Sequence, residues 1–307
     1  MGELLVLVIV VAAVTKLFQR RLPTAVVRAV FAIGLLVPFG ALFYAMWVLW
    51  DRWIGWREFA LFAGLYVLTG VGITLGFHRF LTHRSFETGR VLTFVLVVLG
   101  SMANQGRCID WAAHHLKHHA HSDKEGDPHS PLDGFLHAYC GWILRGPAAD
   151  RERYCKRLLQ DRVVVFVDRT APVWVVLGLF VPYLVAGWQG LLWGGLARIG
   201  FTNHVAFAVN SFGHMYGTQP FDTRDRSRNN WLLAALSFGD GWHNNHHAFP
   251  AMAYHGMRRA EFDPNGIAIR ALARVGLVWN VKGPPDPSVV ERRLRTPLPA
   301  GGREVVT

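Results

Sequence analysis

The chain has 307 residues, of which 51% are hydrophobic and 17% charged, and its formal net charge is +11. This composition is apolar for a soluble globular protein and ordinary for one that lies partly in lipid. The basic residues are scattered between apolar segments rather than gathered on an aromatic face, which argues against a nucleic-acid-binding protein. Membrane lipids with anionic headgroups are the simpler partner for this charge.

The N-terminal region, residues 1–28, contains the apolar stretch Leu4 to Phe18. A stretch of about 15 residues is short for a membrane span. Arg20 and Arg21 follow it, whereas a signal peptide carries its positive charge before the apolar part. We expect a retained membrane segment of variable character, ahead of a core that covers residues 29–255 of a single domain.

Four longer apolar segments predict two transmembrane helical hairpins, because each segment can cross about 30 Å of hydrocarbon as a helix. Tryptophans cluster at the first hairpin loop, as in an interfacial aromatic belt. The last segment contains His204, which we expect to hydrogen-bond a neighbouring helix rather than face lipid. The four segments are Ala29 to Trp50, Arg57 to Phe77, Ala171 to Trp188 and Gly190 to Asn210.

The two remaining segments, Arg79 to Thr170 and His214 to Thr307, are polar and rich in arginine. The positive-inside rule places both on the cytoplasmic side, where they would form a helical cap. Within the first, Val91 to Gly106 is apolar but short, so we expect an interfacial or re-entrant helix there. The proline-rich residues 268–307 are expected to be a loose tail. The predicted fold is an all-α integral membrane protein, with four core spans in two hairpins under a cytosolic helical cap.

Histidine is the residue type whose distribution points to the function. Most of the 15 histidines fall into four tight groups. All four groups lie on the predicted cytoplasmic side, although that side is assigned from hydropathy and charge alone. The groups are His78 and His83 in HRFLTH; His115, His118 and His119 in HLKHH; Asn210 and His214 in NSFGH; and His243, His246 and His247 in HNNHH.

The spacing within these groups suits metal binding. Residues at i, i+3 and i+4 of a helix project from one face, so each HxxHH cluster can bring several imidazoles to one point. His78 and His83 diverge by about 140° on a straight α-helix, so the helix should break between them if both are ligands. Nine imidazoles are too many for one ion and suit two ions with four or five ligands each. The sequence therefore predicts a binuclear metal site.

The blander alternative is a set of ordinary polar histidines. A lone pair of histidines is more often a surface or core feature than a ligand pair, and one HxxHH cluster is weak by itself. Two such clusters with two further groups at one membrane face favour metal. His255 has no partner in its part of the sequence. Four more histidines lie near the second group but off its spacing, and we expect them to be solvated or to support the ligands: His114, His121, His129 and His137.

These motifs resemble the membrane fatty acid desaturase family, in particular its stearoyl-CoA desaturase-like branch. HRFLTH, HLKHH and HNNHH resemble the three histidine boxes of the family, in order, and NSFGHMYG resembles the extra ligand segment of the branch. Asp127 and His129 resemble the DPH sequence after the second box and would support the ligands. Tyr139 departs from the pattern, since the family commonly has histidine there. The resemblance covers residues 30–255.

The resemblance implies two non-haem Fe²⁺ ions bound by the nine histidines, with Asn210 holding one ion through water. It implies removal of two hydrogens from a long saturated acyl chain, carried by coenzyme A or a lipid, at carbon 9, with O₂ and two electrons. An unactivated C–H bond requires a strong oxidant that no side chain here can supply, which agrees with this chemistry. A ferredoxin- or cytochrome-type donor with its reductase would provide the electrons, because no haem-binding module remains once the boxes are placed.

Residues that precede the ligands are candidates for a tunnel that binds the acyl chain: Thr74, Gly76, Gln105, Trp111 and Trp242. The expected location is a bacterial inner membrane, with the active site facing the cytoplasm. One alternative is a membrane di-iron hydroxylase of the same superfamily, which would insert oxygen rather than remove hydrogen. Another is a histidine-rich metal transporter, but its ligands would line a path through the membrane, and only His204 lies deep. The acyl carrier, the bond position and the chain-length preference stay open.

Overall fold

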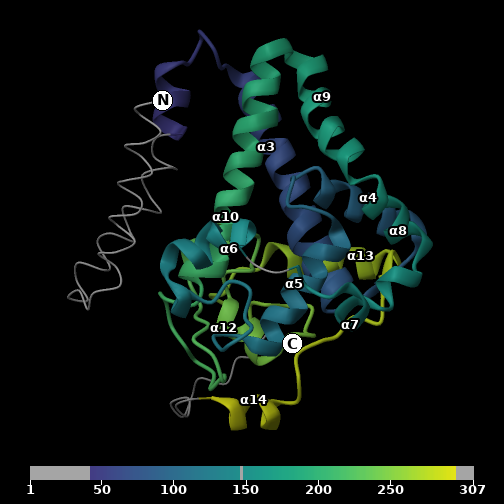
Figure 1. The fold of residues 1–307 in the computed structure, drawn as a ribbon, viewed down its shortest axis with the longest axis vertical. Coiled ribbons are helices and arrows are strands. Elements are labelled where there is room, and N and C mark those ends of the chain that lie inside the picture. The colour runs from purple at the N-terminus through teal and green to yellow at the C-terminus, as the bar shows by residue number, and fades with distance from the viewer. Residues whose placement is uncertain (1–41, 146–147, 295–307) are drawn as a thin grey trace, which may run out of the picture.

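Most of the described chain is helical, and its long helices project together from one end of the molecule (Figure 1). The computed structural model describes residues 42–145 and 148–294. The predicted N-terminal segment and residues 29–41 of the first predicted span lie outside the described residues, whereas residues 42–48 of that span are helical. In the described part, two helical stretches are long and apolar enough to cross a membrane: Trp56–Thr82 and Ala171–Phe212.

The first stretch is a continuous helix that changes its winding. It begins as α3 (Trp56–Val71) and continues as the π-helix η1 (Gly72–Thr82). In α3, apolar residues such as Val67 and Leu68 are exposed, whereas almost every residue of η1 is buried. The helix therefore passes from surroundings that suit lipid into the protein interior, where the first histidine group lies.

The second stretch is a hairpin rather than one helix. α9 (Ala171–Gly190) contains non-helical backbone at Ala186 and Gly187, and the φ of Gly187 is 58°, which favours glycine. The returning arm consists of η5 (Leu191–Ala197) and α10 (Arg198–Phe212). The hairpin predicted between Ala171 and Asn210 is confirmed, and its turn lies at Gly187.

Arg198 ties this hairpin to α4 (Arg90–Ser101), the short apolar helix that the sequence predicts. Its fully buried guanidinium donates hydrogen bonds to the carbonyl oxygens of Met102, just after α4, and Gly178, within α9, at 2.8 and 2.9 Å. The last carbonyls of a helix lack partners within the helix and carry partial negative charge, so a cation there is favourable. One side chain thus joins α4 to both arms of the hairpin.

Glycines let α4 pack directly on η1. A Cβ atom on Gly72 would lie 2.1 Å from the backbone nitrogen of Gly100, and one on Gly76 would lie 2.9 Å from the carbonyl oxygen of Leu96. Small residues allow two helix backbones to approach this closely. Gly76 therefore has a packing role.

The remaining elements surround the inner end of the long helices (Figure 1). α5 (Cys108–His121) shares a core with η1, α4 and α8, in which Phe77, Val97, Ile109 and Val164 are buried. This core holds η1 and α5 side by side, and both carry histidines. The shorter elements up to residue 248 are η2 (Pro131–Asp133), η3 (His137–Gly141), α6 (Trp142–Arg145), α7 (Arg151–Cys155), η4 (Leu158–Gln160), α8 (Arg162–Arg169), α11 (Trp231–Leu236) and α12 (His243–Ala248).

The C-terminal region is folded as far as residue 294, contrary to the loose tail expected from residue 268. Ile269 is fully buried, and Val278 pairs with Thr88 in a two-stranded antiparallel sheet. The proline content was misleading because Pro287 occupies the first turn of a helix, where proline is favoured. The elements are α13 (Pro264–Arg274), β2 (Val278–Trp279), which pairs with β1 (Glu87–Thr88), and α14 (Pro287–Arg293).

Replacing Gly72 with alanine should lower the free energy of unfolding by about 1–3 kcal/mol, because the new methyl group would overlap the backbone of α4. Gly64 is a matched control in the same helix, since a Cβ atom there would meet nothing within 4 Å. Gly64→Ala should leave stability unchanged or raise it by up to about 1 kcal/mol. Denaturant unfolding in detergent micelles measures both, and equal effects would contradict the close approach.

Candidate metal centre

The π-helical winding of η1 brings His78 and His83 together. The backbone N–H of His83 donates to the carbonyl of His78 at 3.1 Å, and the hydroxyl of Thr82 donates to the carbonyl of Phe77 at 2.7 Å. This i to i+5 bonding places residues five apart on one face, and the two imidazole centroids are 4.9 Å apart. The predicted break between the two histidines is therefore wrong. The π-helical winding brings their side chains to the same face without a break.

The two HxxHH clusters lie on α5 and α12, and each cluster divides its imidazoles between two places. Residues at i and i+4 stay together, whereas the neighbouring i+3 residue points elsewhere because successive helical residues are about 100° apart. The expectation that each cluster converges on one point is corrected in this respect. Within each of the resulting groups the ligating atoms lie within 4.8 Å of one another: the first holds His78, His83, His115, His119 and His246, and the second holds His118, His214, His243 and His247.

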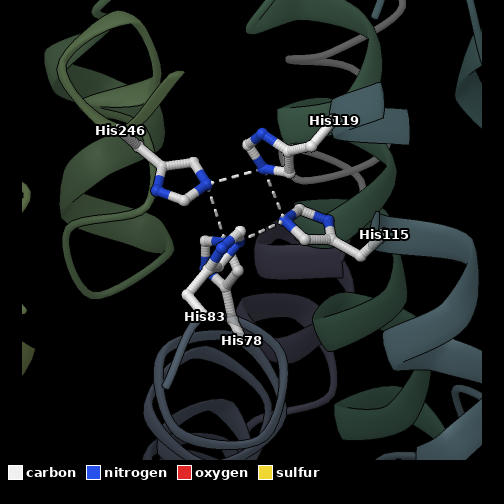
Figure 2. A group of neighbouring side chains, drawn as sticks. All are labelled: His78, His83, His115, His119 and His246. Carbon is white, nitrogen blue, oxygen red and sulfur yellow. Dashed lines mark hydrogen bonds between the residues drawn. The ribbon is translucent and has the colours of Figure 1, made fainter. Parts of the chain in front are cut away.

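In the first group, five imidazoles from η1, α5 and α12 turn nitrogen atoms toward one centre (Figure 2). The Nε2 atom of His246 lies 3.1 Å from that of His78 and 2.9 Å from that of His119. The Nε2 atom of His115 lies 3.0 Å from those of His83 and His119. An octahedral ion with bonds of about 2.1 Å to imidazole nitrogen has neighbouring ligands about 3.0 Å apart, so the spacing suits a metal.

The second group is smaller and adjoins the first. The Nε2 atoms of His214 and His243 are 2.9 Å apart. The Nε2 atoms of His118 and His247 are buried and have no hydrogen-bond partner among the described residues. The rings of His119 and His247, one from each group, stack with centroids 4.5 Å apart. The two groups are therefore neighbours, in contact through the rings of His119 and His247.

Four aspartates contact the outer nitrogens of these histidines. A carboxylate accepts hydrogen bonds, so each contacted Nδ1 carries the proton and the Nε2 atom is left with a lone pair. Asp127 is the one that the sequence pattern identified. The pairs are His78 with Asp240, His214 with Asp123 and His247 with Asp225, each at 2.8 Å, and His118 with Asp127 at 2.9 Å.

The sequence signals for the other three aspartates are unequal. Asp240 stands three residues before His243, and Asp123 stands shortly after the second histidine cluster, so proximity could have suggested both. Asp225 lies in the loop between α10 and α11, where no spacing relates it to a ligand.

A buried charged network lies behind the first group, and the sequence pattern missed it. Arg79 is completely buried and donates two hydrogen bonds of 2.9 Å to Asp263 and one of 3.3 Å to Asp240. His255, for which the sequence suggests no partner, is also fully buried, and its Nδ1 atom lies 3.2 Å from Asp240. Its ring centroid is 4.6 Å from that of His246. The expectation that His255 stands alone is therefore wrong.

These donor sets fit metal ions better than they fit hydrogen bonding among the histidines. A neutral imidazole has one N–H group, and in His78, His118, His214 and His247 that group already faces a carboxylate. Their Nε2 lone pairs then face other imidazoles, and a buried acceptor without a donor is costly. A cation at each centre would satisfy all of these lone pairs at once, and the nitrogen donors suit a transition metal.

A narrow apolar cavity leads to the histidines. It has a volume of about 60 Å³, and His78, His115 and His243 line it together with apolar residues of α10. Three of the predicted tunnel residues, Thr74, Gln105 and Trp111, also line it. The other two do not.

The two exceptions have other roles. Gly76 packs on α4, and the indole N–H of Trp242 donates to the carbonyl oxygen of Phe262 at 2.9 Å.

A second, wider cavity of about 520 Å³ adjoins the first. Gln105, Trp111, His115 and Asn210 line both cavities, so the two meet beside the first histidine group. Asn210 lies one helical turn before His214 but belongs to neither histidine group. It faces the space next to the groups.

The histidines that lie off the cluster spacing have varied positions. The ring of His129 stacks on that of His118 with centroids 4.2 Å apart, close to the second group. His114 lines the wider cavity, and the Nε2 atom of His137 is 3.1 Å from the carbonyl oxygen of Pro128. His121 is half-buried at the end of α5.

Comparison with known proteins decides the family. The sequence model of the family described as Fatty acid desaturase matches residues 53–265, more than half of the chain. The chain belongs to the fatty acid desaturase family. It is an oxidoreductase that acts on fatty acyl groups.

Three relatives of this desaturase are named for different acyl carriers. It is 36% identical to a hex-5-enoyl-[acyl-carrier protein] acetylenase of Moorena producens, over 81% of this chain and 84% of the relative. It is 42% identical to an sn-1 stearoyl-lipid 9-desaturase of Anabaena variabilis, over 74% and 85%. It is 36% identical to an acyl-CoA C20 Δ5-desaturase of Anemone leveillei, over 75% and 76%.

Tyr139, where this desaturase departs from the expected family pattern, lies apart from the two histidine groups. Its hydroxyl is 2.5 Å from the Nδ1 atom of His204, and its ring contacts Phe207 and Phe212. The prediction that His204 bonds a neighbouring helix is confirmed. Tyr139 and His204 together link η3 to α10.

Burial favours the uncharged form of several histidines in the two groups. It lowers the pKa of His118, His119 and His246 well below 6.5, and neighbouring imidazoles lower it further. Burial also lowers the pKa of His255 to about 4. Uncharged imidazoles offer lone pairs to a metal at neutral pH.

The metal-free desaturase should lose stability as the pH falls below about 6.5. Below that pH the histidines of the unfolded chain bind protons, whereas the buried histidines of the folded chain do not. His255 alone therefore lowers the free energy of unfolding by about 2 kcal/mol between about pH 7.5 and about pH 5. Burial raises the pKa of Asp127 to about 6, so this carboxyl increases the free energy of unfolding as the pH falls below 6. It is a single group, whereas many buried histidines act in the opposite direction.

Unfolding of the chelator-treated protein at the two pH values measures this loss. His255→Gln should reduce the pH dependence, and His121→Gln, which removes a half-buried histidine outside both groups, should leave it intact. A stability that does not change with pH would contradict the buried neutral histidines.

Proposed function

We propose that this desaturase introduces a cis double bond at carbon 9 of a long saturated acyl chain, using O₂ and two electrons at two Fe²⁺ ions held by the nine histidines. The observation that carries the proposal is the pair of adjoining imidazole groups at the end of an apolar cavity. Relatives named as 9-desaturases support the bond position. The names of the relatives include acyl-lipid, acyl-carrier-protein and acyl-CoA substrates, and the carrier for this chain is a matter for assay.

The two groups would each hold one ion, the first through five imidazoles and the second through four. When bound, the iron pair supplies the oxidant that an unactivated C–H bond requires. Asp240, Asp123, Asp127 and Asp225 keep the Nδ1 protons in place and so keep the Nε2 lone pairs turned inward. Asn210, beside the groups and one turn before His214, is proposed to hold one ion through water.

The apolar cavity would position the acyl chain. Its walls include Ile73, Val205 and Val209, which suit methylene groups and exclude water. Thr74, Gln105 and Trp111 add a few polar atoms near the histidines, and the indole N–H of Trp111 donates to the side-chain oxygen of Gln105 at 3.1 Å. A chain held in this way would present one pair of methylenes to the oxidant, so positioning selects the bond.

The proposed orientation in the membrane follows the surface of the long helices. Exposed tryptophans, among them Trp47, Trp56 and Trp188, lie at the hairpin loops, and α9 exposes apolar residues such as Leu184. Aromatic side chains of this kind mark membrane interfaces. Four spans would therefore cross a bacterial inner membrane, and the histidine groups would face the cytoplasm within a helical cap.

The electrons would come from an external ferredoxin- or cytochrome-type donor with its reductase. The basic segment 145–157 is a candidate docking surface for an acidic donor, and Arg153 and Lys156 are exposed in it.

Replacing His246 or His118 with alanine should abolish activity and strongly reduce iron binding, because each substitution removes one ligand from a different group. His121→Ala is the matched control on α5, since His121 belongs to neither group. Iron content of the purified protein and product formation measure the effect. Normal iron content and activity in either ligand variant would refute the assignment.

Expression in a host that lacks its own desaturase tests the reaction. Mass spectrometry of the fatty acids should show a cis double bond at carbon 9. An alcohol in its place would establish the hydroxylase alternative, which the family membership disfavours. Separate feeding of acyl-CoA and of acyl-lipid vesicles to purified protein with a donor system would identify the carrier.

A further inference from the structure

A basic cleft lies apart from the acyl cavity. It has a volume of about 590 Å³ and lies between η1, the starts of α4 and α8, and the β1–β2 sheet. It shares no lining residue with either of the cavities beside the histidines. Five cations line it: Arg84, Arg90, Arg157, Arg162 and Lys282.

The carboxylates in the cleft are occupied by neutral donors. Glu87 accepts hydrogen bonds from the indole of Trp279 and the amide of Asn280, at 3.2 and 3.1 Å. Asp161 caps α8 by accepting from the backbone N–H groups of Val163 and Val164. Among the described residues, none of the five cations has a carboxylate oxygen within ion-pair distance. The five cations outnumber the two carboxylates, which offset the positive charge of the cleft only in part.

Two of the cations also repel each other. Burial lowers the pKa of Arg157 and the positive charge of Arg84 lowers it further, more than Asp161 and Glu87 raise it. The backbone fixes the cleft walls, because the N–H of Lys282 donates to the carbonyl of Ser85 at 2.8 Å. An anion between the cations would relieve this repulsion, and guanidinium groups match phosphate oxygens in geometry.

An apolar surface starts beside the cleft and continues toward the long helices. α4 and α8 lie side by side near the foot of α9 (Figure 1). Val91, Phe94 and Val95 share one exposed face of α4, and Val91 is 80% exposed. Phe94 also contacts Trp174 of α9, with ring centroids 5.6 Å apart. The cations of the cleft match the phosphate of a phospholipid headgroup. The exposed apolar side chains that lead away from the cleft match its acyl chains.

We propose that this cleft binds the headgroup phosphate of an anionic phospholipid, whose acyl chains lie along the exposed face of α4 and against α8. The site uses the membrane orientation proposed above but no step of the desaturation. Trp279, exposed at the cleft, then lies at the depth where interfacial tryptophans are enriched. The bound lipid would fix the height of the cap against the membrane surface.

The test compares lipid retention by the full chain with that of two variants that lose the same charge. Delipidated protein in detergent is mixed with vesicles of phosphatidylcholine, with or without phosphatidylglycerol, washed, and analysed by native mass spectrometry. The wild type should retain one phosphatidylglycerol. Arg157→Gln/Arg162→Gln should lower retention by roughly tenfold or more, because two basic contacts are lost. Arg153→Gln/Arg292→Gln, which removes two exposed arginines outside the cleft, should behave as wild type.

Iron content is measured in parallel, so that misfolding of a variant is recognised without any turnover assay. If misfolding occurs, Arg157→Lys/Arg162→Lys replaces the glutamine variant and should retain the lipid. Equal retention by wild type and the cleft variant would overturn the proposal, and so would an equal loss in the control variant. Binding of inorganic phosphate with no retention of phosphatidylglycerol would also overturn it, since the cleft would then be a site for a free anion.

Discussion

A neutral imidazole holds one proton, and the candidate metal centre depends on which nitrogen carries it. Four aspartates face Nδ1 atoms, so the corresponding Nε2 atoms turn inward without protons. Asp240 is in turn held by Arg79, which Asp263 balances with two further hydrogen bonds. The inward-facing lone pairs are thus maintained by surrounding charged residues, most of which are buried, and removal of any of these residues would leave a charge or a lone pair without a partner.

The fold supplies the segments that this arrangement needs. η1 ends a long apolar helix, α5 packs against it through a shared core, and α10 returns from the second hairpin to deliver His214. Each histidine-bearing segment therefore lies where a long helix ends or on a shorter helix that packs near such an end. Membership in the desaturase family indicates a fatty acyl substrate, and the apolar cavity beside the histidines suits an acyl chain.

Periodicity and composition predicted much of this arrangement, because hydropathy reports spans and short spacings report shared helix faces. The hairpin turn at Gly187 and the gathering of nine histidines follow from such local signals. The π-helical winding at His78 does not, and neither does the tight packing of Gly72 and Gly76 on α4. Nor does the network of Arg79, Asp263 and His255, whose members are up to 184 residues apart in the chain. Contacts of that range leave no period in the sequence.

The division of each HxxHH cluster between the two groups has a consequence for assembly. α5 sends His118 to one group and His119 to the other, and α12 divides His247 and His246 in the same way. Both helices are therefore common to both groups, so either group is complete only when both helices are in place. The distance between the two candidate metal positions is therefore set by the geometry of two short helices rather than by a flexible linker.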